Sequence, residues 1–121
     1  MLAYPMFSNL LQNAFDASPK GSRIEIDLEA HETFATFSIT NPGVVPEEIR
    51  ERFFEKYVTA GKQGGTGLGT YSAKLCAETQ GGSIKMETLP DQRTRITITL
   101  QVMKRLTMEE LKAQILGISA Q

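Results

Sequence analysis

A glycine-rich segment that runs directly into a predicted helix is the part of this 121-residue sequence with the clearest chemical potential. Residues Gly61–Thr70 read GKQGGTGLGT, and a helical pattern follows them. Free backbone N–H groups and the positive end of the helix dipole attract anions at such a junction, and glycine lets a phosphate approach closely. The spacing matches neither the Walker A loop nor the dinucleotide fingerprint. The glycines alone therefore leave two alternatives open, a nucleotide site and an inert surface loop.

Two asparagines in the first predicted helix form a second candidate site. Asn9 and Asn13 are four residues apart and Asp16 follows three residues later, so the three side chains share one helical face. Asparagine is a poor helix former, and its amide oxygen is a hard, neutral ligand that suits a Mg²⁺ ion bound to substrate phosphates. An ordinary solvated face explains the same pattern, so helix geometry alone does not decide between the two.

Charge, hydropathy and cysteine content exclude several classes of protein. The net charge of −1 argues against nucleic acid or an anionic membrane as the main partner. We expect neither a transmembrane helix nor a signal peptide, because no long apolar run or cleavage pattern is present. Cys76 is the single cysteine, which excludes an internal disulfide and favours a reducing compartment, so we expect a cytoplasmic location.

The order of predicted elements indicates an α+β two-layer sandwich, in which helices pack on one face of a mixed β-sheet. The elements are a helix over 2–17, strands over 24–28 and 34–40, a short helix from Pro46, a helix over 68–80, and strands over 83–89 and 93–102. The first strand is expected to bury one face. Pro46 is expected at the first helical position, and Leu75 and Cys76 on or near the apolar face of the longer helix.

These candidate sites together resemble the GHKL ATPases, the family of gyrase B, a heat-shock chaperone, histidine kinases and MutL. The segment 9–14, NLLQNA, is similar to the family's N box. Asn41 and Gly43 stand where the first glycine box, DxG, is expected, and 65–69, GTGLG, matches the second glycine box of histidine kinases. The implied fold is the Bergerat-type ATP-binding fold with a mobile ATP lid.

Two further blocks strengthen the resemblance. Phe53 and Phe54 resemble the phenylalanine box of histidine kinases. Thr94 is similar to the threonine of the GTxF signature, although Arg93 stands where that signature has glycine. The blocks occur in the family's order, and the most similar class is the catalytic ATP-binding domain of a bacterial sensor histidine kinase.

The resemblance implies a role for each matched residue. Asn13 is the expected Mg²⁺ ligand, and Asn9 stands where gyrase-like relatives carry a glutamate that activates water. Because an amide cannot act as a general base, fast hydrolysis is not expected. The catalytic residues implied are Asn9 and Asn13, and the nucleotide-binding residues implied are Asn13, Asn41, Gly43, Lys62, Gly65, Gly67, Leu68, Gly69 and Thr94.

Two further positions depart from the family pattern. Asn41 replaces the aspartate whose carboxylate accepts a hydrogen bond from the adenine amino group. The amide oxygen still accepts this bond but lacks charge assistance, worth about 1 kcal/mol, so we expect adenine selectivity with weakened affinity. Asp16 stands where many kinases have a cationic phosphate contact, which we expect to be absent here.

The expected domain covers residues 1–103, with the ATP lid at about 44–68 and a tail at 104–121. We expect the tail to form a short helix on the domain or to link it to a following receiver domain. The resemblance implies that the chain binds ATP and Mg²⁺ and donates the γ-phosphoryl group to a histidine of a separate dimerisation domain, in two-component signalling with a response regulator. The lone His31 is expected in a hairpin turn, so the chain alone should not autophosphorylate.

We expect the isolated domain to be a cytoplasmic monomer, either free or tethered to a membrane sensor through other parts of a longer protein, with no nucleic acid and no direct membrane contact. Two alternatives remain. One is a stand-alone GHKL serine kinase of the anti-sigma type. The other is a degenerate nucleotide-binding module that serves for docking, which the replacement at Asn41 would favour. Nucleotide binding by the chain separates the kinase from the docking module.

Overall fold

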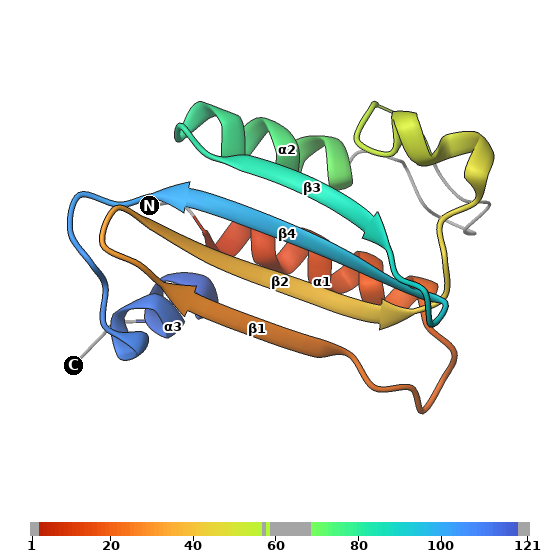
Figure 1. Cartoon of the computed structure of the whole chain (residues 1–121), viewed down its shortest axis with the longest axis horizontal. Helices are drawn as coiled ribbons and strands as arrows, with labels where there is room; N and C mark the ends of the chain where they lie inside the picture. The colour runs from red at the N-terminus through yellow and green to blue at the C-terminus, as the bar shows by residue number, and fades with distance from the viewer. Residues whose placement is uncertain (1–2, 57, 59–68, 119–121) are drawn as a thin grey trace.

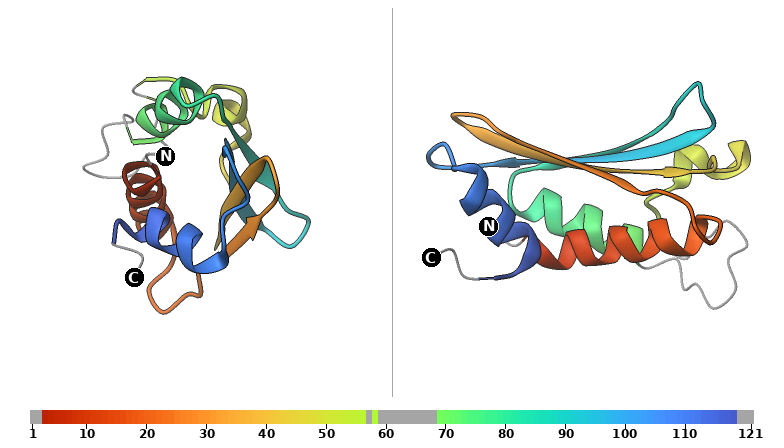
Figure 2. Two further views of the ribbon diagram at one scale, coloured as in Figure 1. Left: turned by 90° about the vertical axis from the view of Figure 1, so that its left-hand side faces the viewer. Right: turned by 90° about the horizontal axis from the view of Figure 1, so that it is seen from below.

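The protein folds into two layers, a β-sheet and a set of α-helices that cover one of its faces (Figures 1 and 2). The computed structural model describes residues 3–56, 58 and 69–118. The elements are α1 (Tyr4–Ala17), β1 (Glu25–Ala30), β2 (Phe34–Pro42), the 3₁₀ helix η1 (Glu47–Arg52), α2 (Gly69–Thr79), β3 (Ser83–Thr88), β4 (Arg93–Gln101) and α3 (Met108–Leu116). The predicted α+β two-layer sandwich is confirmed. None of the helices described is long and apolar enough to cross a membrane.

The four strands lie in the order β1-β2-β4-β3, and every neighbouring pair is antiparallel. The prediction of a mixed sheet is therefore wrong for the strands that the structure describes. β3 runs in the same direction as β2, but the hairpin after β3 places β4 between them. β1 and β4 also run in one direction with β2 between them, so strands of the same direction are never neighbours.

The core lies between the central strands and the helices. Along β4, buried and half-buried side chains alternate, as expected for a strand with one covered face. Large buried side chains of the core include Met6, Phe7 and Leu10 of α1, Phe37 and Ile39 of β2, and Ile96, Ile98 and Leu100 of β4. β1 is an edge strand, and Ile26 is 43% exposed, so its predicted buried face is covered only in part.

α2 packs against α1 through its smallest residues. Ala73 and Ala77 are fully buried, which allows the two helices to approach closely. Leu75 is 49% exposed, and Cys76 is half-buried. The prediction that Leu75 lies on the packed face is therefore wrong, because the close contact with α1 favours alanine over the larger side chain.

The expected short helix of the tail is present as α3. The Thr107 hydroxyl accepts from the Glu110 N–H at 3.1 Å, and the Glu110 carboxylate accepts from the Thr107 N–H at 3.0 Å. This reciprocal capping box, chiefly its bond from the Thr107 backbone, lowers the pKa of Glu110 below its usual value. Leu111 and Ile115 of α3 join the core beneath the sheet. α3 therefore stabilises the same core as the other two helices.

The two ends of the sheet bring different elements together (Figure 1). At the Gly43 end, β2 leaves the sheet beside the turn between β3 and β4, close to the last turn of α1. η1 and the first turn of α2 lie at this same end. At the opposite end, called here the Phe34 end, the turn between β1 and β2 lies near the ends of β4 and α2.

Candidate nucleotide-binding site

The backbone of Gly43 is held from both sides at the point where the chain leaves β2. Its N–H donates to the carbonyl oxygen of Gln92 at 2.8 Å, and its own carbonyl accepts from the Thr94 hydroxyl at 2.7 Å. Its φ of +99° lies in the region that favours glycine. A Cβ at this position would lie 3.8 Å from the carbonyl oxygen of Ala17, so the last residue of α1 lies close to Gly43. The glycine predicted to belong to the first glycine box therefore presents a fixed backbone without a side chain.

Asn41 lies two residues before Gly43 and is only 8% exposed. Its Nδ2 donates to the carbonyl oxygen of Pro42 at 2.8 Å, which fixes the plane of the amide. Thr94 is its register partner on β4 and is also buried. This bond uses one of the two Nδ2 donors, and Oδ1 is the hydrogen-bond acceptor that the side chain can offer to a ligand.

The asparagines of α1 lie at different depths. Asn13 is half-buried and takes part in an interaction within the chain, whereas Asn9 is exposed. Asn13 lies one turn before Ala17, the residue that approaches Gly43, so its amide belongs to the Gly43 end of the molecule. Asp16 is exposed and accepts a hydrogen bond from Gln12 at 3.0 Å. The structure thus brings Asn13, Asn41, Gly43 and Thr94 to one end of the fold.

The two phenylalanines after η1 attach this region to α2. Their rings meet edge to face, with centroids 5.0 Å apart, and both are partly buried against the core. The Phe53 carbonyl accepts from the hydroxyl of Thr70, in the first turn of α2, at 3.2 Å. Lys74 of α2 lies 6.0 Å from the centre of the Phe54 ring. Pro46 is the residue before η1 and not its first helical position, which corrects the sequence prediction.

The phosphate side of the predicted site falls mostly outside the part of the chain that the structure describes. Lys62, Gly65, Gly67 and Leu68 all lie there. Gly69 is described and lies at the start of α2, while the predicted start at Leu68 lies outside the described residues. The roles of these residues remain predictions.

Sequence reasoning missed the contribution of the turn between β3 and β4. Gln92 has a φ of +65°, the only positive value among the non-glycine residues described, and its carbonyl holds Gly43. Arg93 donates to Asp91 at 2.6 Å and to Glu25 at 3.0 Å. These contacts, the hydrogen bond to Asp91 first, raise the pKa of the Arg93 guanidinium above its usual value. The only sequence signal was that Arg93 departs from the family's glycine.

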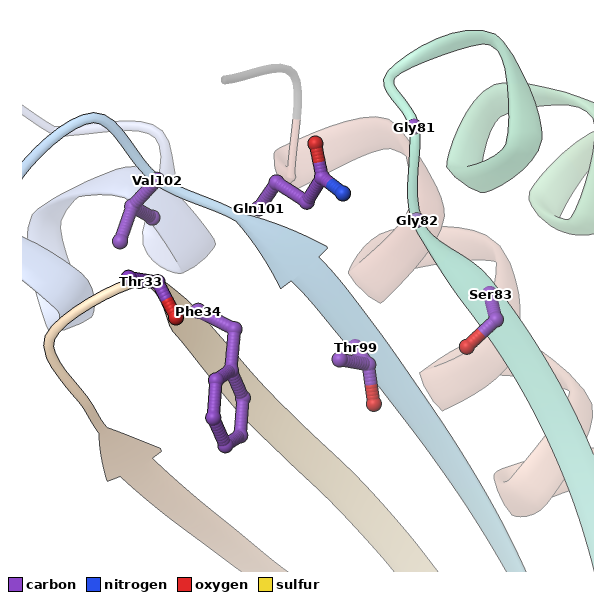
Figure 3. A pocket seen from close by; sticks show the side chains of 8 residues that line it. All are labelled: Thr33, Phe34, Gly81, Gly82, Ser83, Thr99, Gln101 and Val102. Atoms are coloured by element: carbon purple, nitrogen blue, oxygen red, sulfur yellow. The ribbon is translucent and has the colours of Figure 1, made fainter.

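A hollow of about 490 Å³ lies at the Phe34 end, away from these residues (Figure 3). The ring of Phe34 and the polar groups of Ser83, Thr99 and Gln101 line it. Phe34 also stacks on His31, with ring centroids 4.3 Å apart. Of the predicted nucleotide-binding residues that the structure describes, none lines this hollow.

The fold is that of histidine kinase catalytic domains. The mycobacterial sensor histidine kinase MprB has a TM-score of 0.70 and 27% sequence identity, with 80% of this chain and 70% of that chain covered. The catalytic domain of histidine kinase ThkA, in a nucleotide-free form, has a TM-score of 0.66 and 29% identity, with 77% of this chain and 62% of that chain covered.

Residues 2–104 match the family described as histidine kinase-, DNA gyrase B-, and HSP90-like ATPase, and the chain belongs to this family. The sensor histidine kinase RppB of Synechocystis sp. is 31% identical over 106 residues, which cover 82% of this chain and 23% of that protein. The histidine protein kinase SaeS of Staphylococcus aureus is 35% identical over 104 residues, which cover 78% of this chain and 29% of that protein. The chain thus spans about a quarter of the length of these curated relatives.

Proposed function

We propose that this chain binds Mg²⁺ and ATP at the Gly43 end and presents the γ-phosphoryl group to a histidine on a separate dimerisation domain in two-component signalling. The observation that carries the proposal is the arrangement of Asn41, Gly43 and Thr94. A buried acceptor and a fixed, side-chain-free peptide lie together there, in a chain that belongs to an ATPase family.

The adenine base is the part of the nucleotide that these three residues would bind. The Asn41 Oδ1 accepts a hydrogen bond from the adenine amino group, and its Nδ2 stays bonded to Pro42. The bare backbone at Gly43 lets the flat base approach closely. Thr94 holds the Gly43 carbonyl, so the site is arranged before the ligand arrives. A neutral acceptor binds less tightly than a carboxylate, which is consistent with modest affinity.

Asn13 is the residue that would hold Mg²⁺. Its neutral amide oxygen suits an ion that keeps several waters and takes its other ligands from phosphates, and its half-buried place near the end of α1 fits that role. When bound, Mg²⁺ offsets the negative charge on the phosphate oxygens during transfer. Asn9 is exposed and cannot take a proton from water, so the bound ATP is kept for transfer.

The phosphates would extend from the base toward the start of α2. Gly69 opens that helix, and the preceding Gly65, Gly67 and Leu68 would supply backbone N–H groups there. Lys62 would add a positive charge from the lid, which covers about 44–68. Each of these contacts stabilises anionic oxygens and contributes no covalent chemistry.

The acceptor histidine would come from another domain. His31 follows β1 at the Phe34 end, where it stacks on Phe34 and contacts Glu29 at 3.2 Å. The whole sheet therefore separates it from Gly43. The isolated chain should bind ATP without autophosphorylation, and a response regulator would be the next partner in the full protein.

Calorimetric titration with ATP and ADP, with and without Mg²⁺, tests the proposal. We expect micromolar to low-millimolar binding by the wild type, with Mg²⁺ increasing the affinity. Asn13→Ala should lose this Mg²⁺ effect and keep metal-free binding. Gln12→Ala is the matched control, since Gln12 is an exposed neighbour on α1 and should leave both values unchanged. Absence of binding by the wild type at millimolar nucleotide would contradict the proposal and favour the docking module.

A further inference from the structure

One arginine connects three separate parts of the Gly43 end. The Arg93 guanidinium donates through Nε to Asp91 in the turn between β3 and β4, and through a terminal nitrogen to Glu25 on β1. β1 and β4 are not neighbours, because β2 lies between them. Arg93 is the register partner of Pro42, so its side chain crosses the last residue of β2 to reach Glu25. We call this arrangement the Arg93 bridge.

The turn that the bridge holds is not one that its residues favour. Gln92 occupies the left-handed region, where a side chain with a Cβ is unfavourable. The turn is closed by the bond from the Gln92 N–H to Leu89 at 3.2 Å and by the bond from the Leu89 N–H to Arg93 at 2.7 Å. Its position relative to β2 depends on contacts outside the turn, and the bridge is such a contact.

The carbonyl of Gln92 is the acceptor for the Gly43 N–H, so a shift of this turn moves the peptide that would meet the base. We propose that Arg93 is a positioning residue for the nucleotide-binding loop. By joining Asp91 and Glu25 across the end of β2, it holds the Gln92 carbonyl where it fixes Gly43. This inference rests on the proposed function of the Gly43 end as a nucleotide site.

The chemistry of the side chain suits this role. A guanidinium presents several donors in a rigid plane, so one group bonds to two carboxylates in different directions. Arg93 is only 34% exposed, whereas its partners Glu25 and Asp91 are 48% and 55% exposed. The cation is thus the most shielded member, and its loss removes both contacts at once.

The test compares wild type and Arg93→Ala in calorimetric titrations with ATP and with adenosine. We expect Arg93→Ala to weaken both by the same factor, about fivefold, because the effect acts on the base and not on the phosphates. Hydrogen exchange of the Gly43 amide should become faster in Arg93→Ala. Glu25→Gln, which removes only the far contact, should weaken binding by about twofold.

Two further variants separate positioning from a general loss of stability. Lys85→Ala removes the Lys85–Glu87 ion pair of 3.8 Å on β3, which does not touch the loop, and should leave affinity and Gly43 exchange unchanged. Gln92→Gly added to Arg93→Ala should recover much of the lost affinity, since glycine adopts the left-handed region readily.

The ATP affinities and the Gly43 exchange rates distinguish three outcomes. If wild type binds ATP and Arg93→Ala binds with the same affinity and the same Gly43 exchange, the inference is overturned and the proposed function stands. If Lys85→Ala weakens binding as much as Arg93→Ala does, the weaker binding reflects a general loss of stability, and the positioning role of Arg93 is overturned. If wild type itself does not bind nucleotide, the proposed function fails and this inference fails with it.

Discussion

The two ends of one sheet are built in different ways. At the Phe34 end, unusual backbone conformations have local causes: Gly81 follows α2 with a φ of +75°, and Gly117 follows α3 with a φ of +71°. At the Gly43 end, the partners of Gly43 and one partner of Arg93 are distant in the sequence. Thr94 lies 51 residues from Gly43, and Arg93 lies 68 residues from its partner Glu25.

We infer from this difference that contacts at the Phe34 end stabilise the fold, whereas those at the Gly43 end also arrange the backbone for a ligand. Local caps satisfy the backbone of one helix, and the loss of one affects mainly that helix. A network of distant partners holds one peptide in one place, and a missing member leaves polar groups without partners. We therefore expect changes at the Phe34 end to lower stability alone, and changes at the Gly43 end to lower affinity as well.

The largest effect is expected from Leu111→Ala in α3, which removes a side chain that is 1% exposed. The cavity should lower the free energy of unfolding by about 2–5 kcal/mol, while the affinity for ATP stays unchanged. Urea denaturation and calorimetry measure the two quantities. Leu116→Ala, at a site 49% exposed on the same helix, is the control and should change the stability by less than about 0.5 kcal/mol. Weaker ATP binding in folded Leu111→Ala would contradict the expectation that changes away from the Gly43 end lower stability alone.

Gly43→Ala should come next, because alanine at a φ of +99° is strained. We expect a loss of about 1–2 kcal/mol in stability and at least a tenfold weaker affinity for ATP. Gly21→Ala is matched to it, with a φ of +86° and open space around a Cβ, and should lose stability only. Equal ATP affinities in the two variants would show that Gly43 has no special place in binding.

Thr94→Val removes the hydroxyl that holds the Gly43 carbonyl and keeps the shape of the side chain. The unpaired carbonyl should lower the free energy of unfolding by about 1–2 kcal/mol and weaken ATP binding about fivefold. Thr94→Ser retains the hydroxyl and should bind like the wild type. If serine proves as weak as valine, the methyl group and not the hydrogen bond is what matters.

Thr107→Ala should have the smallest effect, a loss of about 1 kcal/mol in stability from the capping box, with no change in ATP affinity. The pH dependence sharpens this prediction. The pKa of Glu110 is lowered in the folded state, so its contribution is present above the ordinary carboxyl pKa and is lost as pH falls through the lowered value. Thr107→Ala keeps the backbone bond to Glu110, so the matched variant for the pH dependence is Glu110→Gln, whose side chain does not ionise. The stability difference between wild type and Glu110→Gln should therefore shrink in acid. A difference that grows in acid would contradict this assignment.

The Phe34 end was largely predictable from the sequence, because its signals are local. Helical periodicity predicted residues 2–17 and the structure has Tyr4–Ala17, and a short helix was expected in the tail, where α3 lies. The hairpin turn that contains His31 was predicted for the same reason. Two predictions were wrong because they depended on packing between elements. They concern the strand directions across the sheet and the buried face of α2, where Ala73 and Ala77 are buried and Leu75 is exposed.

The Gly43 end was predictable only through the family resemblance. Asn41, Gly43 and Thr94 carry no local signal that they would meet, since the register of β2 on β4 brings them together. The contacts of Gln92 and Arg93 were not predicted. Neither a carbonyl that accepts from a distant glycine nor a side chain that bridges an intervening strand leaves a periodic pattern in the sequence. Long-range polar contacts of this kind are fixed by topology.

The most direct test of the central claim is to map ATP binding residue by residue in nuclear magnetic resonance spectra of the chain titrated with Mg²⁺ and ATP. The account predicts that the amides of Gly43 and Thr94 shift with nucleotide concentration, and that those of Gly82, Thr99 and Gln101 at the Phe34 end stay unchanged. Shifts confined to the Phe34 end, or no shifts at millimolar ATP, would contradict the assignment of the nucleotide site to the Gly43 end.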